Sequence, residues 1–228
     1  MNAKRKIYLV GGSKGGVGKS MVTMALLDYL KGRGDKLLLI ESDTSNPDVY
    51  KAYREEIECK TINLDEANGW IELVNTTDAN PDATVVINTA ARNNDGVSRY
   101  GDTLASTLGE MSRDLTTFWV INRQRDGLEL LKDYTAAISD STVHVVRNGY
   151  FGDENAFELY NGSKVRKTVE EAGGKSLTFP NLADRVSDDI YTKRLSLGKA
   201  AKELPIGNRA ELRRWLGLTS SMFAQVTT

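Results

Sequence analysis

A glycine-rich stretch near the start of the chain, residues 11–20 (GGSKGGVGKS), carries the residue types that bind phosphate. Glycines let a backbone turn tightly and bring its N–H groups close to an anion, and the first turn of a helix adds unpaired N–H groups and a partial positive charge. Lys19 is placed to supply a point charge to the terminal phosphates of a nucleotide, and Ser20 a hydroxyl to Mg²⁺. The stretch predicts a phosphate-binding loop, although Ser13 stands where the usual pattern has its first glycine.

The elements that must position this loop are strands and helices in alternation. Short apolar runs predict buried strands at 6–12, 36–40, 83–88, 116–122, 141–148 and 175–180. Helical spacing predicts a helix from Lys19 that ends at Gly32 and Gly34, two helices at the end of the chain, and others at 69–77, 99–111, 127–138 and about 153–171, where Gly162 is a candidate break. This alternation is typical of an α/β fold, a mainly parallel twisted sheet with helices on both faces. Such sheets bind ligands beyond the carboxyl ends of their strands, where the glycine-rich stretch falls.

The composition is that of a single globular domain over residues 1–228, with 40% hydrophobic residues and a net charge of −1. Cys59 and His144 are the only residues of their types, which excludes a disulfide framework and a cysteine and histidine metal site within one chain. No apolar run approaches the ~18 residues that a membrane span needs. The apolar run before Gly11 is too short for a signal peptide. We therefore expect a cytoplasmic protein.

Lys14 is a second lysine, five residues before Lys19, in a loop that needs only one for one phosphate chain. The segment KGGVGKS resembles the deviant Walker A motif of the ParA/MinD family of P-loop ATPases. The resemblance implies that ATP and Mg²⁺ bind here and that two subunits form a homodimer with two ATP molecules sandwiched between them. Lys14 then matches the signature lysine, which reaches the partner's nucleotide, while Lys19 serves its own. The residues alone also allow Lys14 to be a solvated loop lysine.

Acidic residues follow the second predicted strand, in the segment IESDTSNPD. The family has an aspartate pair spaced D-x-D here, and the resemblance implies that Asp43 holds the attacking water in line with the γ-phosphate. Glu41 or Asp43 is then also expected to reach a magnesium-bound water. The residues alone fit Asp43 equally to a helix cap or a turn before Asn46 and Pro47, and the two roles are compatible.

The third predicted strand departs from the family pattern, because Asn88 stands where the Walker B strand has its aspartate. An amide can accept a hydrogen bond from a magnesium-bound water but brings no negative charge. The loss of such a partner typically costs about 10–100-fold in metal affinity or activity. Glu41, at the end of a neighbouring strand, is a candidate to compensate. We therefore expect nucleotide binding together with slow ATP hydrolysis, at a rate that Asn88 leaves open.

Asn148, at the end of strand 141–148, and Pro180, after the last strand, match positions that line the adenine site in the family. Asparagine at a strand end is also a common turn former. The expected nucleotide contacts are Ser13, Lys14, Gly15, Gly16, Val17, Gly18, Lys19, Ser20, Met21, Asn148 and Pro180. The expected catalytic residues are Lys14, Lys19 and Asp43. The expected metal contacts are Ser20 and, through water, Glu41, Asp43 and Asn88.

The C-terminal segment 191–228 differs in charge from the rest of the chain, with seven basic residues and two acids. Family members that position DNA grip the phosphate backbone with basic patches on the ATP-bound dimer, and members that position membrane proteins use a C-terminal amphipathic helix. Leu212, Trp215 and Leu216 have helical spacing that fits either use, or a helix that packs Trp215 on the body. The expected partner is nonspecific DNA or a DNA-bound adaptor protein, with a membrane surface as the weaker alternative.

These features together predict an ATPase that positions or partitions DNA, such as a plasmid, or a protein cargo. The segments ESDTSNPD and INTAAR further resemble a plasmid-borne branch found near conjugation genes, such as StbB, and that placement would allow association with the nucleoid. One alternative is an ATP-dependent ligase of the dethiobiotin synthetase type, in which a second lysine before GG is not expected. Another is a nucleotide-gated binding module that does not hydrolyse ATP.

Overall fold

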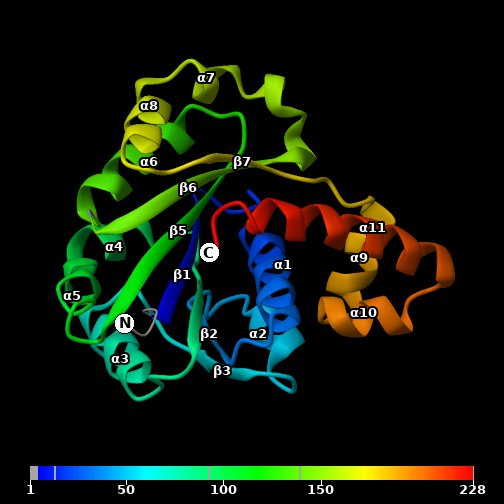
Figure 1. The fold of residues 1–228 in the computed structure, drawn as a ribbon, viewed down its shortest axis with the longest axis horizontal. Helices are drawn as coiled ribbons and strands as arrows, with labels where there is room; N and C mark the ends of the chain where they lie inside the picture. The colour runs from blue at the N-terminus through cyan, green and yellow to red at the C-terminus, as the bar shows by residue number, and fades with distance from the viewer. Residues whose placement is uncertain (1–4, 13, 92, 139, 228) are drawn as a thin grey trace.

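Seven parallel strands form one twisted sheet in a computed structural model that describes residues 5–12, 14–91, 93–138 and 140–227 (Figure 1). Their order across the sheet is β3-β2-β4-β1-β5-β6-β7, and every neighbouring pair is parallel. The strands are β1 (Arg5–Gly12), β2 (Leu37–Glu41), β3 (Glu58–Thr61), β4 (Thr84–Asn88), β5 (Arg113–Ile121), β6 (Ser141–Asn148) and β7 (Ser176–Phe179). The predicted α/β class with a parallel sheet is confirmed, and β1 lies at its centre.

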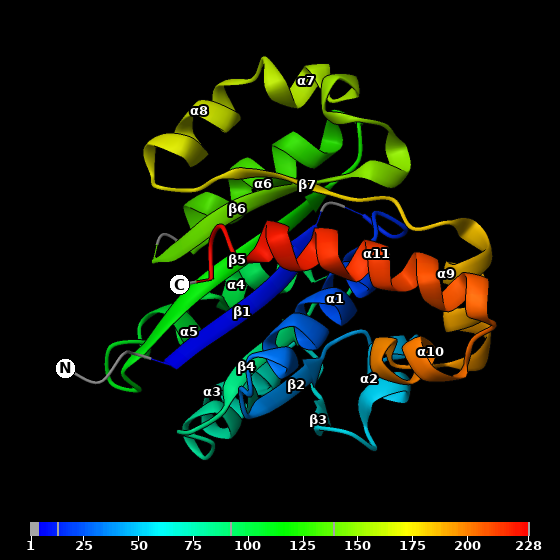
Figure 2. The same ribbon diagram turned by 45° about the vertical axis from the view of Figure 1, so that its right-hand side comes forward.

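Helices cover both faces of the sheet. One face is packed by α1 (Lys19–Gly32), α2 (Asp48–Tyr53), α9 (Asp184–Lys193), α10 (Leu197–Glu203) and α11 (Ile206–Phe223). The other is packed by α3 (Ala67–Asp78), α4 (Asn94–Tyr100), α5 (Asp102–Ala105), α6 (Asp126–Ala137), α7 (Glu158–Asn161) and α8 (Lys164–Glu171). Two short 3₁₀ turns, η1 (Gly149–Phe151) and η2 (Glu154–Ala156), follow β6. Figure 2 shows α11 lying along α1, which it contacts.

Strand β1 shows why the sheet needs two covered faces. Its side chains alternate in direction, so Ile7 and Leu9 enter the core under α3–α8, whereas Tyr8 and Val10 enter the core under α1 and α11. All four side chains are buried. A strand that is apolar on both sides is stable only between two helical layers. The glycine-rich loop that follows β1 lies at the carboxyl edge of the sheet.

Several predicted elements differ from the structure. The helix predicted at 99–111 is two short helices, α4 and α5, followed by turns. The hydroxyl of Thr107 bonds back to the carbonyls of Thr103 and Leu104, a local alternative to regular helix hydrogen bonding. The helix predicted around 153–171 is broken after Gly162, where Ser163 caps α8 by accepting a hydrogen bond from Arg166 N.

Two further differences concern elements that the apolar pattern did not predict. Helix α2, with six residues, is too short to show a sustained helical period, and the four-residue edge strand β3 carries only one apolar residue, Cys59. The chain also ends in three helices, α9, α10 and α11, where two were predicted. Leu212 and Trp215 of α11 are fully buried in the core, which confirms the packing alternative for the apolar face of this helix.

His144 of β6 is the buried titratable group from which we predict a pH dependence of stability. Burial, aided by the charge of Lys175, lowers its pKa from 6.5 to about 4, and its Nδ1 accepts a hydrogen bond from Lys175 N. The unfolded chain takes up this proton near pH 6.5 and the folded protein only near pH 4. The free energy of unfolding should therefore fall as the pH drops through this window, by on the order of 3 kcal/mol from this group.

The variant His144→Gln keeps an acceptor for Lys175 N but cannot take up a proton. Between pH 7 and pH 4.5 it should lose less stability than the wild type, as measured by chemical denaturation at both values. Equal losses in the two proteins would contradict the buried, neutral state of His144.

Candidate functional site

The glycine-rich loop joins β1 to α1 at the carboxyl edge of the sheet, where the sequence placed it. Gly16 and Gly18 have φ angles of 77° and 103°, in the left-handed region that favours glycine. A Cβ atom on Gly18 would also lie 2.3 Å from Asn148 Nδ2, so the end of β6 packs directly against the loop. No side chain caps α1, whose first N–H groups therefore face the loop as an anion site. Ser13 lies outside the described residues.

The two lysines of the loop have different surroundings. Lys19 is buried, and its Nζ donates to the carbonyl of Lys14 at 2.9 Å, inside the turn of the loop. Burial lowers the pKa of Lys19 to about 8, against the opposing effect of the Asp43 charge. The side chain of Lys14 instead points outward, is half exposed, and forms an ion pair with Asp126 at the start of α6. Lys19 thus faces its own loop, and Lys14 lies on the surface.

Glu41 and Asn88 are neighbours on adjacent strands, paired in register at the ends of β2 and β4. Asn88 Nδ2 donates to Glu41 Oε1 at 2.9 Å, and the backbone N–H of Asp43 donates to the same oxygen at 3.0 Å. The hydroxyl of Thr23, on α1, lies 2.9 Å from Asn88 Oδ1 and is placed to donate to it. Burial raises the pKa of Glu41 to about 7, although the hydrogen bonds from the Asp43 backbone and the Asn88 amide oppose the shift.

Asp43 combines the two roles that the sequence allowed. Its Oδ1 accepts a hydrogen bond from the backbone N–H of Asn46 at 3.1 Å, which fixes the turn after β2. Its charge also acts on Lys19, so the carboxylate lies close enough to the loop to influence that lysine. The turn thereby holds an acid near the place where terminal phosphates would lie.

One carboxylate oxygen of Glu41 indicates whether these residues fit the expected Mg²⁺. Glu41 Oε2 is buried and has no hydrogen-bond partner among the described residues, an arrangement that costs stability. A metal-bound water would supply the missing donor. Mg²⁺ usually keeps several waters and takes its other ligands from phosphates and one or two protein oxygens. The Ser20 hydroxyl, in the first turn of α1, and the carboxylates of Glu41 and Asp43 fit such a site.

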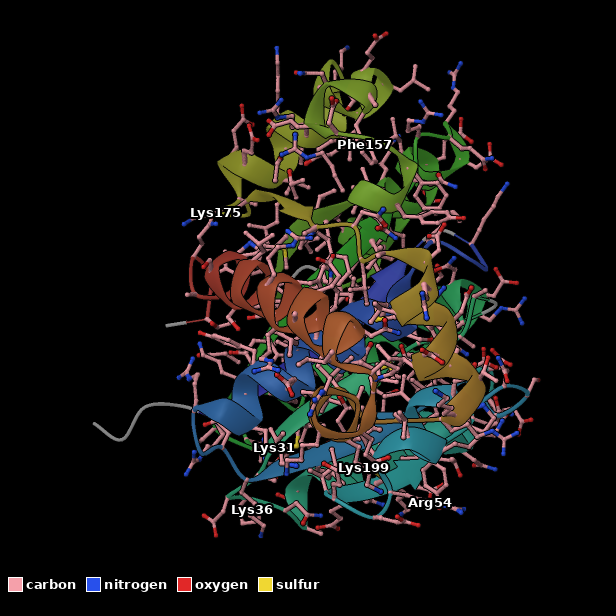
Figure 3. The ribbon with its side chains drawn as sticks, turned by 90° about the vertical axis from the view of Figure 1, so that its right-hand side faces the viewer. Lys31, Lys36, Arg54, Phe157, Lys175 and Lys199 are labelled. Atoms are coloured by element: carbon pink, nitrogen blue, oxygen red, sulfur yellow. The ribbon has the colours of Figure 1, made fainter. Side chains whose placement is uncertain are left out.

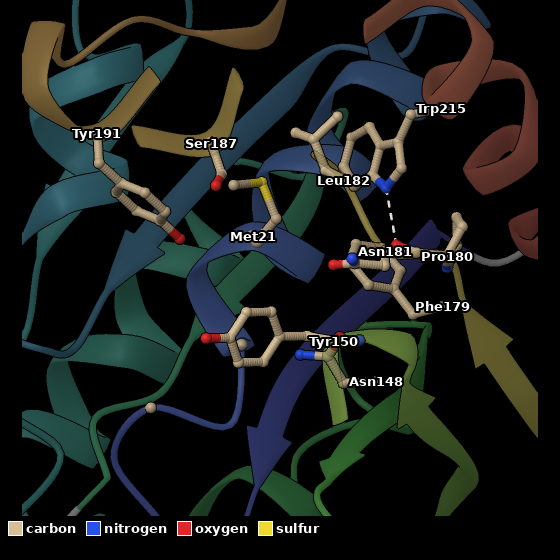
Figure 4. A pocket seen from close by; sticks show the side chains of 12 residues that line it. Met21, Asn148, Tyr150, Phe179, Pro180, Asn181, Leu182, Ser187, Tyr191 and Trp215 are labelled. Atoms are coloured by element: carbon tan, nitrogen blue, oxygen red, sulfur yellow. Dashed lines mark hydrogen bonds between the residues drawn. The ribbon is translucent and has the colours of Figure 1, made fainter. Parts of the chain in front are cut away.

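A cavity of about 190 Å³ adjoins the glycine-rich loop on the side where β6 and β7 end (Figure 4). It is lined by Gly16, Gly18, Met21, Asn148, Tyr150, Phe179, Pro180, Asn181, Leu182, Ser187, Tyr191 and Trp215. The structure thus brings Met21, Asn148 and Pro180 together, as the sequence predicted. The Oδ1 of Asn148 accepts from Tyr150 N, the turn contact that the sequence also allowed, and its Nδ2 donates to Val17 O.

Sequence reasoning missed several residues of this edge. Asp126 pairs with Lys14 across 112 positions, and no local pattern marks that contact. Ser187 and Tyr191 reach the cavity from α9. The sequence reasoning gave Ser187 no role and placed Tyr191 at the start of the C-terminal basic segment rather than in the site. Thr23 could have been found, because it lies one helical turn after Lys19 and so shares its face of α1.

Comparisons with known proteins agree with this geometry. Residues 8–148 match the family model described as the CobQ/CobB/MinD/ParA nucleotide binding domain. Protein MobD of Acidithiobacillus ferrooxidans is 70% identical over 211 residues, which are 92% of this chain and 93% of that protein.

Similar solved structures have much lower sequence identity. The MinD cell division protein of Aquifex aeolicus is 14% identical, with a TM-score of 0.55 over 93% of this chain and 97% of that one. The signal recognition particle receptor FtsY of Elizabethkingia anophelis is 15% identical, with a TM-score of 0.53 over 95% of this chain and 66% of that one. At these identities the likeness shows the fold alone.

Replacing Asn88 by aspartate should destabilise the protein without nucleotide. A carboxylate oxygen would take the place of an amide that now donates to Glu41 at 2.9 Å, so two buried like charges would face each other. We expect Asn88→Asp to lower the free energy of unfolding by roughly 3–5 kcal/mol at pH 8, as measured by chemical denaturation.

The double variant Glu41→Gln/Asn88→Asp is the matched control, because it moves the single negative charge from β2 to β4 and keeps an amide opposite a carboxylate. Most of the lost stability should return in this protein. If the double variant were as unstable as Asn88→Asp, the direct contact of residues 41 and 88 could not be the cause.

Proposed function

The chain belongs to the CobQ/CobB/MinD/ParA nucleotide-binding domain family, and from this premise we propose that it is an ATPase that dimerises on ATP and positions a DNA or protein cargo. The observation that carries the proposal is the difference in exposure between the two lysines of the loop. Lys19 is buried and turned into its own loop, whereas Lys14 is half exposed on the edge of the sheet. A lysine in that place is available to a nucleotide on a second subunit.

The ion pair of Lys14 with Asp126 does not prevent this role. Both side chains are about half exposed, and an exposed pair contributes only about 0–1 kcal/mol to stability. The triphosphate chain of the partner's nucleotide carries far more negative charge than one carboxylate. Lys14 can therefore exchange Asp126 for the partner's nucleotide at little cost, and its charge would stabilise the transferring phosphoryl group.

Hydrolysis would depend on residues at the ends of β1, β2 and β4. Mg²⁺, when bound with ATP, would neutralise charge on the β- and γ-phosphates. Ser20 would hold the ion directly, and Glu41 would hold one of its waters in place of the acid that Asn88 lacks. Asp43 would orient the attacking water, because its carboxylate is fixed by the turn to Asn46 and its charge acts on Lys19.

A subunit-mixing experiment tests the proposed function. The variants Lys14→Ala and Asp43→Ala should each hydrolyse ATP poorly. When they are mixed, a heterodimer has one site with an intact Asp43 and an intact Lys14 from its partner, and one site with neither. Each heterodimer should therefore recover up to half of the activity of a wild-type dimer, as measured by phosphate release and the measured share of heterodimers.

Heterodimer formation is checked by differently sized tags, and each variant alone is the control for residual activity. Heterodimers that form without any recovery would show that Lys14 does not act across the interface. A wild-type protein that binds ATP and dimerises without releasing phosphate would be a nucleotide-gated binding module instead.

The C-terminal cations favour DNA as the surface that the dimer binds. Three of them are held by acids of the same chain, in the pairs Lys193–Asp189, Lys199–Glu55 and Arg214–Glu211 (Lys199 is labelled in Figure 3). Three others, which we call the basic cluster, are Lys202, Arg209 and Arg213. Arg209 donates to the carbonyl of Lys202, and Arg213 to that of Arg209. In the described part of the chain none of the three forms an ion pair with an acid, so their charge is available to phosphates.

The alternative of a membrane surface has less support. The apolar face of α11 is already used in the core, since Leu212 and Trp215 are fully buried. None of the described helices is long and apolar enough to cross a membrane. A protein cargo is compatible with the fold, because an Aquifex aeolicus MinD structure was solved as a MinC:MinD complex.

We predict that ATP increases the affinity for nonspecific duplex DNA, because a dimer offers two basic clusters. Reversing the cluster by Lys202→Glu, Arg209→Glu and Arg213→Glu should weaken binding and flatten its salt dependence. The slope of log K against log salt concentration should fall by about 0.9 for each DNA phosphate that the variant no longer neutralises. Fluorescence anisotropy with a labelled duplex over a salt series measures both effects.

The matched control makes the same change of charge on other exposed surfaces, with Lys36→Glu, Lys132→Glu and Lys167→Glu. It should keep most of the slope. If both triple variants reduced the slope equally, net charge rather than the basic cluster would govern binding; if vesicles bound and DNA did not, the surface would be a membrane.

A further inference from the structure

A groove of about 370 Å³ follows the outer side of β7, the strand at one edge of the sheet. In the described part of the chain, β7 pairs with β6 and with no further strand. Figure 2 shows α7 and α8 on one side of β7 and α11 on the other. The groove extends around the strand between these sides, because both Arg147 of β6 and Leu218 of α11 line it.

The backbone of β7 offers hydrogen-bonding groups to this groove. Val145 N donates to Lys175 O at 2.9 Å, which sets the phase of the ladder between β6 and β7. Alternate residues of a parallel strand face the same neighbour, so Ser176 and Thr178 turn their N–H and C=O groups to the open edge. Thr178 is also exposed. Edge groups of this kind are a template for pairing with another extended chain.

Arg147 is a buried cation at the same groove, with a side chain that is only 3% exposed. Its Nη1 lies 3.0 Å from Glu154 Oε1 and donates to Asn161 Oδ1, while its Nη2 donates to Thr178 Oγ1 at 3.0 Å. Among the described residues, Nε has no partner. Glu154 is 59% exposed on the short turn η2, so a second carboxylate can join or replace it at the guanidinium.

The charges beside β7 favour an acidic partner. Two ion pairs near the strand are neutral overall, Arg147–Glu154 and Arg166–Glu170. Lys175, which precedes the strand, is exposed, and its Nζ donates to the carbonyl of Gln225 (Lys175 is labelled in Figure 3). In the described chain Lys175 forms no ion pair with an acid. These residues together therefore carry an excess of positive charge.

The side of the groove formed by α11 is apolar. Leu218 is 46% exposed, and Met222, about one helical turn later, lines the same groove. Successive side chains of an added strand point alternately to opposite faces of the sheet. An acidic side chain directed toward Arg147 would therefore be followed by one directed toward Leu218, where an aliphatic residue fits.

We propose that the edge of β7 binds an extended segment of a partner protein, with an acidic side chain toward Arg147 and the neighbouring aliphatic side chain toward Leu218. In strand addition, main-chain hydrogen bonds give affinity and the alternate side chains give specificity. Because β7 has four residues, a segment of similar length covers it. The surface needs neither a nucleotide nor a second subunit, so failure of this proposal would leave the proposed function unchanged.

A displayed library of random dodecapeptides tests the proposal. Selection on the wild-type protein should enrich peptides in which acidic and aliphatic residues alternate. A selected peptide is then labelled, and its dissociation constant is measured by fluorescence anisotropy. Replacing its acidic residue by glutamine should weaken binding by about tenfold or more, because a hydrogen-bonded charge pair is lost.

The variant Thr178→Pro blocks the edge. It removes an N–H that faces outward, and proline is tolerated on edge strands at such positions. It should abolish binding of the selected peptide. Thr61→Pro is the matched control on the opposite edge strand, β3. Ile62 N donates to Glu41 O, so the exposed Thr61 likewise turns its N–H outward, and this variant should bind the peptide as the wild type does.

Two further variants separate the two sides of the groove. Leu218→Asp changes an exposed residue and should weaken the peptide by about tenfold, since an apolar contact is replaced by a charge. In Arg147→Gln, exchanging the peptide's acidic residue for glutamine should no longer matter. If Arg147→Gln does not fold, Lys175→Glu gives the charge test at an exposed position, and it should weaken the acidic peptide more than its glutamine counterpart.

The proposal would be overturned by a selection that enriches no peptide, or by peptides that bind Thr178→Pro as well as the wild type. It would also be overturned if the nucleotide-free protein sedimented as a dimer that Thr178→Pro converts to a monomer. The edge of β7 would then join two copies of this chain.

Discussion

The hydrogen bond from Asn148 Nδ2 to Val17 O holds together the two halves of the candidate site. It joins the phosphate-binding loop, which follows the central strand β1, to the end of β6 two strands away. Gly18 makes the contact possible, because any larger residue would collide with the amide. The same asparagine anchors Tyr150 at the edge of the adjoining cavity through its oxygen. The glycine-rich loop and this cavity therefore depend on one residue, and moving either would disturb the other.

A second constraint is the single buried acid between β2 and β4. Glu41 is fully buried, its pKa is raised to about 7, and one of its oxygens has no partner among the described residues. A buried carboxyl oxygen without a partner lowers stability. Glu41 lies beside Asn88 because adjacent strands of a parallel sheet present their carboxyl ends at one edge, and this makes it the candidate to replace the acid that β4 lacks. The buried acid thus lies at the end of β2 instead of β4, at the neighbouring position on the same edge of the sheet.

The sequence was sufficient to predict features that depend on neighbouring residues in the chain. Glycines and Lys19 at the end of an apolar run predicted the loop, and alternating periods predicted the sheet with helices on both faces. Prediction failed where contacts join distant positions or side chains compete with the backbone. Nothing local shows that Asn148 is already bonded to Val17, that Lys14 meets Asp126, or that the hydroxyl of Thr107 bonds back within a predicted helix. The roles of Asp43, Asn88 and Lys14 in catalysis remain predictions, since they depend on a nucleotide and a second subunit.

The C-terminal helices connect the candidate site to the charged surface. Helix α9 contributes Ser187 and Tyr191 to the cavity, and α11 supplies Trp215, which holds Pro180. Two turns or less separate Trp215 from Arg209 and Arg213 of the basic cluster on the same helix. A ligand in the cavity would therefore contact α11, the helix that also carries Arg209 and Arg213 of the basic cluster. Because the apolar side of α11 is used by the core, the helix offers its partners charge rather than an apolar face, and this favours a polyanion over a lipid surface.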